Sequence, residues 1–451
     1  MTDRNTVIPI LQRLQNEAPL DPDPTNPAAA KTFAELYVDD LHAAHGDVAL
    51  RLATEVELSV GSRHAYLFSG TIGSGKSTEL RRLAKALRES GHHPVVVNIM
   101  EYLNPQLPVG IADLLMAMAM GVWEGWARQS GRDPDEGKRL AWWQSLLAMR
   151  PEGTELEISG GFLKLKMALS ANPTFRERLR QHFEASLDTL VESVNDFFAK
   201  LAEEIRNDSR LGPHSKLVVI IDSLEHFGGQ STPGQVDEVL QSLLRMFNTF
   251  NAYLRLDAWT AIYSVPPLLH KLAPGIAASF GMASTYYLTS AHVFQDRSDA
   301  PDEDTIQNKM LPLLTKRLGL DDPSSIIGTA QLRDIILNTG GDLRDLLRTL
   351  RAALLAGLTS GFPVSQAQLE RVYNELRRPY LPFPKDSAER LQQIRRDKEA
   401  RLETAADWQW VISDLAQKRV LLYLNGTEWY DVHPLLRKPL EAQFASSSSA
   451  P

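Results

Sequence analysis

The sequence predicts an α/β protein with a parallel sheet, a large mainly helical insertion, and further helices after the sheet. A glycine-rich phosphate-binding loop at residues 70–78 stands between a predicted strand and a predicted helix. Residues 217–222 form an apolar run of the kind buried on both faces of a parallel sheet. About five strands alternate with helices over residues 65–288, which is typical of a doubly wound layer.

Composition limits the class of protein. The chain has 451 residues, enough for about two to four domains. It has no cysteine, which excludes disulfides and thiolate metal sites, and its net charge of -8 argues against nonspecific coating of nucleic acid. The longest nearly apolar stretch, residues 114–123, is too short to cross a bilayer, and no segment resembles a signal peptide. We therefore expect a cytoplasmic protein with no membrane contact.

The N-terminal part is predicted to lead into the sheet. Residues 1–32 contain four prolines between positions 19 and 27, which favours an extended lead-in. Helical patterns follow, from residue 33 to about 46 and from 48 to about 59. The first predicted strand, residues 65–68, then enters the loop.

The phosphate-binding loop carries the clearest chemistry. It consists of Gly70, Thr71, Ile72, Gly73, Ser74, Gly75, Lys76, Ser77 and Thr78. Glycines at this spacing let successive backbone N–H groups turn inward around phosphate oxygens, and the following helix adds partial positive charge at its N-terminus. Lys76 would reach the β- and γ-phosphates, and the Ser77 hydroxyl would coordinate Mg²⁺. The loop therefore predicts binding of a nucleoside triphosphate.

Residues 104–214 are predicted to be an insertion, because one crossover helix is enough to join the strands on either side. A helical stretch at 111–149 carries methionines and tryptophans, which we interpret as core and, as an alternative, as a partner-binding groove; they are Met116, Met118, Met120, Trp123, Trp126, Trp142 and Trp143. Residues 155–166 alternate apolar and charged residues around a Ser-Gly-Gly turn, which predicts a hairpin. A long amphipathic helix follows residue 173.

Two strand ends are candidates for the catalytic edge. Asp222 ends the apolar run at 217–222, where a carboxylate can hold Mg²⁺ through water. Glu225 is the nearest carboxylate that could orient an attacking water, although a surface acid is an equal interpretation. The next strands are predicted at residues 258–265, with Ser264 close to the end of the strand, and at 285–288.

The C-terminal third is predicted to be mainly helical. Gly340–Gly341 interrupts the helices, and arginines at 344, 348 and 351 then recur on one helical face. That face is either solvated or brings Arg344 to a γ-phosphate. Helices at 387–401 and 408–418 precede two strands around Asn425-Gly426, which suggests a winged helix. The low-complexity residues 446–451 are predicted to be disordered.

These features, in this order, resemble AAA+ ATPases, and within them the branch that includes origin-recognition ATPases and STAND signalling ATPases. The resemblance implies a core at 33–290, a lid at 291–360, a winged-helix domain at 361–441 and a tail at 442–451. It also implies that Asp222 helps to hold Mg²⁺, that Ser264 is the first sensor and that Arg344 is the second. Residues 37–39 would lie near the adenine.

The sequence departs from the family pattern in three places. Ser223 replaces the usual acid after the Mg²⁺ aspartate. No arginine precedes the last strand where AAA+ rings supply a finger, and Arg255, Arg297 and Arg317 are poor substitutes. The strand that ends near Ser264 lacks the arginine found in many STAND members. We therefore expect hydrolysis that is slow or that depends on assembly.

Three functions follow from these features. The first is a switch that binds ATP and Mg²⁺ and presents a surface to a protein partner or to copies of itself, which for STAND relatives often means signalling or defence against phage. The second is an origin-recognition-like ATPase that binds DNA through Arg437, Lys438 and the helix at 390–401. The third is a small-molecule kinase, which the multidomain architecture disfavours.

Overall fold

The computed structural model describes residues 4–15, 17–42, 46–61, 63–134, 162–184, 187–209, 211–227, 233–267, 269–282, 284–402 and 405–447. The chain forms two compact units, each taken here by itself. The sheet unit consists of Ala49–Gly70 and Glu79–Tyr287. The helical unit consists of Met1–Val48, Thr71–Thr78 and Leu288–Pro451.

A five-stranded sheet has the order β2-β3-β4-β1-β5. Its strands are β1 (Ala65–Gly70), β2 (His93–Asn98), β3 (Leu217–Asp222), β4 (Trp259–Val265) and β5 (Tyr286–Leu288). β1 pairs with β4, β4 with β3 and β3 with β2, all in parallel. Every residue of β1, β3 and β4 is buried, which explains their apolar sequences. The predicted α/β fold class, a parallel sheet with a large helical insertion, is confirmed.

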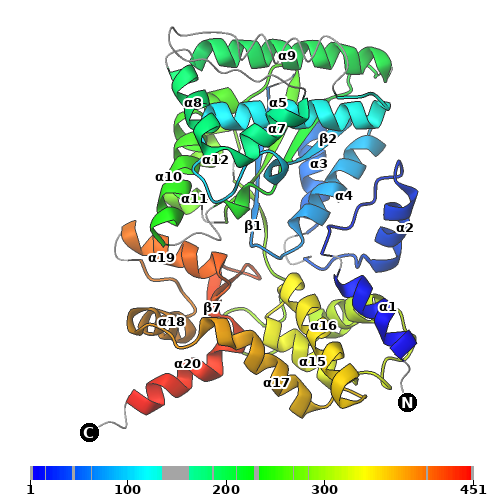
Figure 1. The fold of residues 1–451 in the computed structure, drawn as a ribbon, viewed down its shortest axis with the longest axis vertical. Coiled ribbons are helices and arrows are strands. Elements are labelled where there is room, and N and C mark those ends of the chain that lie inside the picture. The colour runs from blue at the N-terminus through cyan, green and yellow to red at the C-terminus, as the bar shows by residue number, and fades with distance from the viewer. Residues whose placement is uncertain are drawn as a thin grey trace. The chain divides into compact units, whose positions relative to one another are not determined.

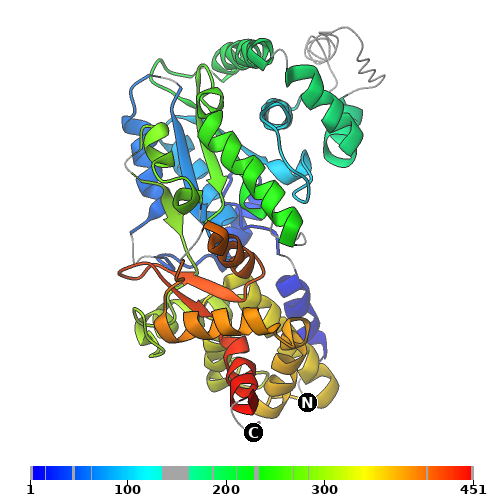
Figure 2. The ribbon, with the colours of Figure 1, turned by 90° about the vertical axis from the view of Figure 1, so that its left-hand side faces the viewer.

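Helices cover both faces of this sheet. Figure 2 shows α4 in blue and α10 in green on opposite sides of the strands. The α-helices that lie wholly or mostly in the sheet unit, in chain order, are α3 (Val48–Leu58), α4 (Lys76–Glu89), α5 (Ile111–Ser130), α7 (Phe162–Ala171), α8 (Pro173–Glu184), α9 (Leu187–Asp208), α10 (Pro233–Thr249), α11 (Leu269–Leu272) and α12 (Ile276–Ser279).

Helix α5 packs directly on β2. A Cβ atom added at Gly121 would lie 2.2 Å from Cγ1 of Val97, so only glycine allows this approach. The methionines of α5, together with Trp123 and Trp126, are buried. Their prediction as core is confirmed, whereas Trp142 and Trp143 lie outside the described residues.

The predicted hairpin at 155–166 is wrong in its second half. Phe162 begins helix α7, and Phe162, Leu165 and Leu169 are buried at helical spacing. Burial of this face favours the helix over the alternating pattern of residues 162–166. Residues 155–161 lie outside the described part of the chain.

The helical unit is built around α16 (Leu343–Ser360), which packs against α1 (Arg4–Gln15), α15 (Thr329–Thr339) and α17 (Gln366–Arg377) (Figure 1). The other α-helices here are α2 (Pro27–Leu36), α13 (Glu303–Thr305), α14 (Leu311–Leu318), α18 (Lys385–Asp397), α19 (Ala405–Ala416) and α20 (Pro434–Ser447). Helices at 387–401 and 408–418 are confirmed, with shifted ends. None of the described helices combines the length and the apolar character that crossing a membrane requires.

Two predictions about the chain ends are wrong in part. The lead-in is helical over Arg4–Gln15, because Val7, Ile10, Leu11 and Leu14 lie on one helical face and are buried in the helical core. Prolines at 19–27 follow this helix and do not interrupt it. The predicted tail is helical over residues 442–447, since they continue α20, which is anchored by buried Leu436 and Leu440, and residues 448–451 lie outside the described part of the chain.

The Asn-Gly hairpin is confirmed. β6 (Val420–Tyr423) and β7 (Trp429–Val432) pair in antiparallel fashion, with Tyr423 opposite Trp429. The two rings stack with centroids 4.4 Å apart, and both side chains are fully buried. The hairpin is therefore part of the core of the helical unit.

Candidate nucleotide-binding site

The phosphate-binding loop is tightly curled between the end of β1 and the start of α4. Gly73 and Gly75 have φ angles of +92° and +96°, which favour glycine. The Ser74 hydroxyl donates to the carbonyl oxygen of Thr71 at 2.8 Å. Lys76 is only 3 % exposed, and its Nζ donates to the same carbonyl at 2.7 Å. The ammonium group is therefore held over the loop, where a cation can attract phosphate.

The turn between α15 and α16 lies against this loop within the helical unit. A Cβ atom at Gly73 would be 2.5 Å from Oδ2 of Asp342, and one at Gly75 would be 3.3 Å from Cδ1 of Leu343. The backbone after β5 completes the contact, because Ala291 N donates to Gly341 O at 3.0 Å. The predicted lid thus touches the loop through the segment that links its two helices.

Asp342 joins this contact to a cluster of charges. It caps α16 by accepting a hydrogen bond from Asp345 N at 2.9 Å, and it accepts another from Lys418 Nζ at 2.8 Å, both on Oδ1. Its Oδ2, beside Gly73, has no hydrogen-bond partner among the described residues. Asp342 is 1 % exposed, and burial raises its pKa despite the nearby Lys418. A carboxylate oxygen is therefore held next to a loop built for anions.

Asp345 completes the cluster. It accepts from Lys418 Nζ at 2.8 Å, and its Oδ2 lies 3.5 Å from Nε2 of His433. Burial opposes ionisation of Asp345, but His433 and Lys418 together hold its pKa below the usual value. The sequence pattern missed Lys418 and His433, because they come from the turn before β6 and the residue after β7 and meet Asp345 only in the fold.

Arg344 lies in the first turn of α16, one residue after Leu343. Its Nε is 3.8 Å from Glu17, which also forms two hydrogen bonds with Arg348 at 2.6 and 2.8 Å. The hydrogen bond from Arg348 is the main reason that the pKa of Glu17 is lowered. Two of the three recurring arginines therefore share one carboxylate of the N-terminal segment, and the sensor role of Arg344 stays a prediction.

The N-terminal segment also reaches the phosphate-binding loop. Leu20 N donates to Oγ1 of Thr78 at 3.2 Å, and Nε2 of His42 would lie 3.9 Å from a Cβ at Gly75. Tyr37 stacks on Phe33, with ring centroids 4.5 Å apart. This arrangement keeps an aromatic residue in the segment that the resemblance assigns to the adenine, which stays a prediction.

In the sheet unit, Glu225 and Ser264 form a buried pair at the carboxyl end of the strands. The Ser264 hydroxyl donates to Oε2 of Glu225 at 2.6 Å and accepts from Leu224 N at 3.1 Å. Ser223 has a φ of +77°, which turns the chain after β3 so that Glu225 points back to β4. The surface interpretation of Glu225 is wrong, since this side chain is buried.

Asp222 ends β3 and is 2 % exposed, with Nη1 of Arg81 at 3.6 Å from its carboxylate. A buried carboxylate suits a hard cation such as Mg²⁺. Among the described residues no group of three or more His, Asp or Glu could hold a metal. Mg²⁺ bound with a nucleotide needs only one or two protein oxygens, because phosphates and waters supply the others, so these residues fit the ion.

Comparisons with known proteins give similarity in structure alone. No protein-family model matches the sequence, and no curated protein sequence matches it significantly. Solved structures with a similar course of the chain include the ORC2 protein of Aeropyrum pernix, at 12% identity and a TM-score of 0.39, covering 96% of this chain and 98% of that one. Another is the Drosophila ORC bound to DNA, at 9% identity and 0.40, covering 98% and 93%. A third is a Walker-type ATPase of Pyrococcus abyssi, at 14% identity and 0.40, covering 88% and 95%. These scores lie below 0.5 and do not decide a family.

Proposed function

We propose that this chain binds ATP with Mg²⁺ and hydrolyses it slowly, and that it acts as a nucleotide-dependent switch. The observation that carries the proposal is the curled loop at Gly70–Thr78, with Lys76 buried over it. Inward amides and one ammonium group form an anion site that suits a triphosphate. Ser77 and Asp222 would provide oxygen ligands to Mg²⁺, which would neutralise phosphate charge during transfer.

Glu225 is the proposed group that orients the attacking water. A carboxylate in this role must be fixed in place, and the hydrogen bond from Ser264 fixes Glu225. That same bond involves Oε2, and Nε2 of His226 lies 3.8 Å from Oε1. Ser264 would then be a positioning residue, consistent with its predicted role as the first sensor.

The switch is proposed to lie at the lid turn. A γ-phosphate would add negative charge close to Asp342, whose Oδ2 faces Gly73. Since like charges repel strongly when buried, bound ATP and an ionised Asp342 in this position oppose each other. The nucleotide would thus bias the position of α16 and of Lys418 and His433, which Asp342 and Asp345 bind.

Steady-state ATPase assays test the hydrolysis proposal. Glu225→Gln keeps the hydrogen bond with Ser264 possible but removes the base, so we expect a loss of about a hundredfold in kcat. Glu89→Gln, which changes an exposed acid at the end of α4, is the matched control and should hydrolyse ATP like the wild type. A Glu225→Gln variant as fast as the wild type would remove Glu225 from the mechanism.

The origin-recognition alternative is the second candidate, and the charges of the C-terminal segment bear on it. The basic residues predicted to contact DNA are largely paired within the helical unit. Arg437 and Arg395 both bind Asp431, and Arg390 binds Asp414. Cations that are already paired release few counterions on DNA, so weak binding is expected. The assay is a gel-shift titration over salt, with and without ATP; saturable binding at about 0.15 M salt would favour this alternative.

Five further expectations are predictions from the resemblance to AAA+ ATPases. They are the STAND branch, the winged-helix assignment, the defence role, a protein partner and a homo-oligomer. Light scattering with and without ATP checks the oligomer directly. A phosphorylated product formed from a candidate acceptor would favour the kinase hypothesis instead.

A further inference from the structure

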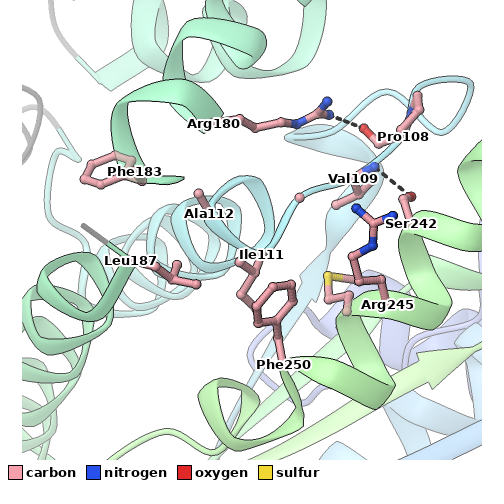
Figure 3. A pocket seen from close by; sticks show the side chains of 12 residues that line it. Pro108, Val109, Ile111, Ala112, Arg180, Phe183, Leu187, Ser242, Arg245 and Phe250 are labelled. Atoms are coloured by element: carbon pink, nitrogen blue, oxygen red, sulfur yellow. Dashed lines mark hydrogen bonds between the residues drawn. The ribbon is translucent and has the colours of Figure 1, made fainter. Parts of the chain in front are cut away.

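The insertion in the sheet unit contains a cavity that the nucleotide proposal does not use. Figure 3 shows it among the first turn of α5, helix α8, the start of α9 and helix α10. Its volume is about 400 Å³, within the range of small-molecule sites. Much of the lining is apolar: Ile111, Ala112, Phe183, Leu187, Met246 and Phe250.

Two arginines lie at one side of this cavity, Arg180 from α8 and Arg245 from α10 (Figure 3). Arg180 is fixed, because its Nε donates to Oδ2 of Asp113 at 3.0 Å and its Nη2 donates to Pro108 O. Arg245 is exposed. The loop before α5, residues 107–110, is held by a hydrogen bond of 2.9 Å from Val109 N to Oγ of Ser242.

The positive charge around this loop exceeds the negative charge. Arg176 is 1 % exposed, and both Arg176 and Arg180 bind the buried carboxylate of Asp113. Nε and Nη1 of Arg176 have no acceptor among the described residues. Burial lowers the pKa of Arg176, and the attraction of Asp113 only partly opposes this effect.

A second cavity, of about 530 Å³, lies beside the same loop and shares Pro108 and Arg180 with the first. Arg176 and Arg178 also line it, against one acid, Glu177. The ligand that complements this region is therefore negative at one end.

We propose that the cavity lined by Arg180 and Arg245 binds a small amphipathic anion, with its carboxylate or sulfonate at the arginines and its apolar body among the side chains of α5, α8, α9 and α10. A half-open cavity of about 400 Å³ between four helices suits a small molecule better than a folded partner. An aliphatic chain of about ten carbons would fill it, and each buried methylene favours binding. The insertion would thereby carry a ligand site of its own, apart from the residues of the phosphate-binding loop.

Calorimetric titration of the full chain with decanoate tests this proposal. We expect saturable 1:1 binding, and weaker or no binding of decyltrimethylammonium, which has the same chain and the opposite charge. Arg245→Gln should weaken decanoate binding roughly tenfold, because it removes a charged donor from an exposed position without disturbing the fold. Lys200→Gln, an exposed cation of α9 away from the cavity, is the matched control and should bind like the wild type.

A second variant locates the apolar half of the site. Ala112→Phe would fill part of the cavity, so decanoate binding should be lost while circular dichroism shows a folded protein. Equal affinity for the two probes, or affinity unchanged in both Arg245→Gln and Ala112→Phe, would overturn the proposal. Binding of an acidic peptide with no binding of decanoate would also overturn it, in favour of a protein ligand. ATP affinity, measured in parallel, keeps this outcome separate from the nucleotide proposal.

Discussion

Asp342 combines two tasks in one side chain. It caps α16 through the backbone of Asp345, and its other oxygen faces Gly73 of the phosphate-binding loop. Helix caps are ordinary features, but a buried carboxylate beside an anion site raises the free energy of binding an anion there. Asp342 would therefore couple the position of the lid turn to the charge of a bound nucleotide.

Asp342→Asn should increase affinity for ATP by roughly tenfold, because it removes a negative charge near the phosphates while asparagine can still cap the helix. Titration of a fluorescent ATP analogue measures this change. Asp345→Asn is the control, since Asp345 also binds Lys418 but is not the residue that faces Gly73. If Asp345→Asn raised the affinity for ATP as much as Asp342→Asn, the loss of the Lys418 contact would explain the rise, and the charge of Asp342 near the loop would not.

His93 makes the free energy of unfolding depend on pH. Burial, with help from Arg88, lowers the pKa of this imidazole to about 4. In the unfolded chain histidine titrates near 6.5, so the unfolded state binds more protons between these two values. The stability that the neutral ring provides is present above pH 6.5 and is lost as the pH falls towards 4.

His93→Gln should reduce that loss. Urea unfolding at pH 7 and at pH 5 should show a smaller difference for the variant than for the wild type, by about 1–2 kcal/mol. His64→Gln, which changes an exposed histidine before β1, should leave the wild-type difference in place. An identical pH dependence in His93→Gln and wild type would contradict the assignment to His93.

The sequence identifies single residues where chemistry follows local spacing. The loop at Gly70–Thr78 could be predicted because its glycines, Lys76 and Ser77 occupy fixed positions between a strand and a helix. The pairing of Glu225 with Ser264 could not be predicted, because it depends on the left-handed turn at Ser223. Pairing of neighbouring strands brings such residues together although they lie far apart in the sequence.

At the scale of elements, the turn at Gly340–Gly341 decides how α15 and α16 meet. A Cβ at Gly341 would lie 2.0 Å from the carbonyl oxygen of Ala291, and its φ is +83°. The backbone after β5 can approach the lid only because this residue has no side chain. The glycine pair therefore does more than end a helix.

Gly341→Ala should destabilise the protein by more than 2 kcal/mol, because it combines a backbone clash with an unfavourable φ. Gly131→Ala is the matched control: its φ of +68° lies in the left-handed region, but a Cβ there would meet nothing within 4 Å. It should cost only about 1 kcal/mol for the left-handed conformation. Thermal unfolding of both variants measures the difference, and equal losses would contradict the packing described for Ala291.

Errors in predicting elements have a common cause. The pattern at 162–166 alternates over five residues, yet Leu169 extends a helical face that only the packed insertion reveals. Prolines at 19–27 indicated an extended lead-in, but the apolar residues of α1 before them determine the helix. A short alternating pattern does not decide the secondary structure when a longer helical face can be buried in the fold.

In the molecule as a whole, the strand order of the sheet determines which polar side chains lie close together. In the order β2-β3-β4-β1-β5, β4 lies between β1 and β3, so the parallel strands end at one edge with Gly70, Ser264 and Asp222. The sequence predicted the number of strands and their parallel arrangement. It could not give their order or the charged cluster at Lys418, since both depend on contacts between distant segments.

The central claim is that the buried ammonium group of Lys76 and the curled loop bind the triphosphate. Equilibrium titration with ATP and Mg²⁺ tests it most directly in the wild type, in Lys76→Ala and in Lys85→Ala, an exposed lysine of the same helix. We predict saturable binding by the wild type and by Lys85→Ala, and a loss of at least a hundredfold in affinity for Lys76→Ala. Unchanged affinity in Lys76→Ala would contradict the proposed site.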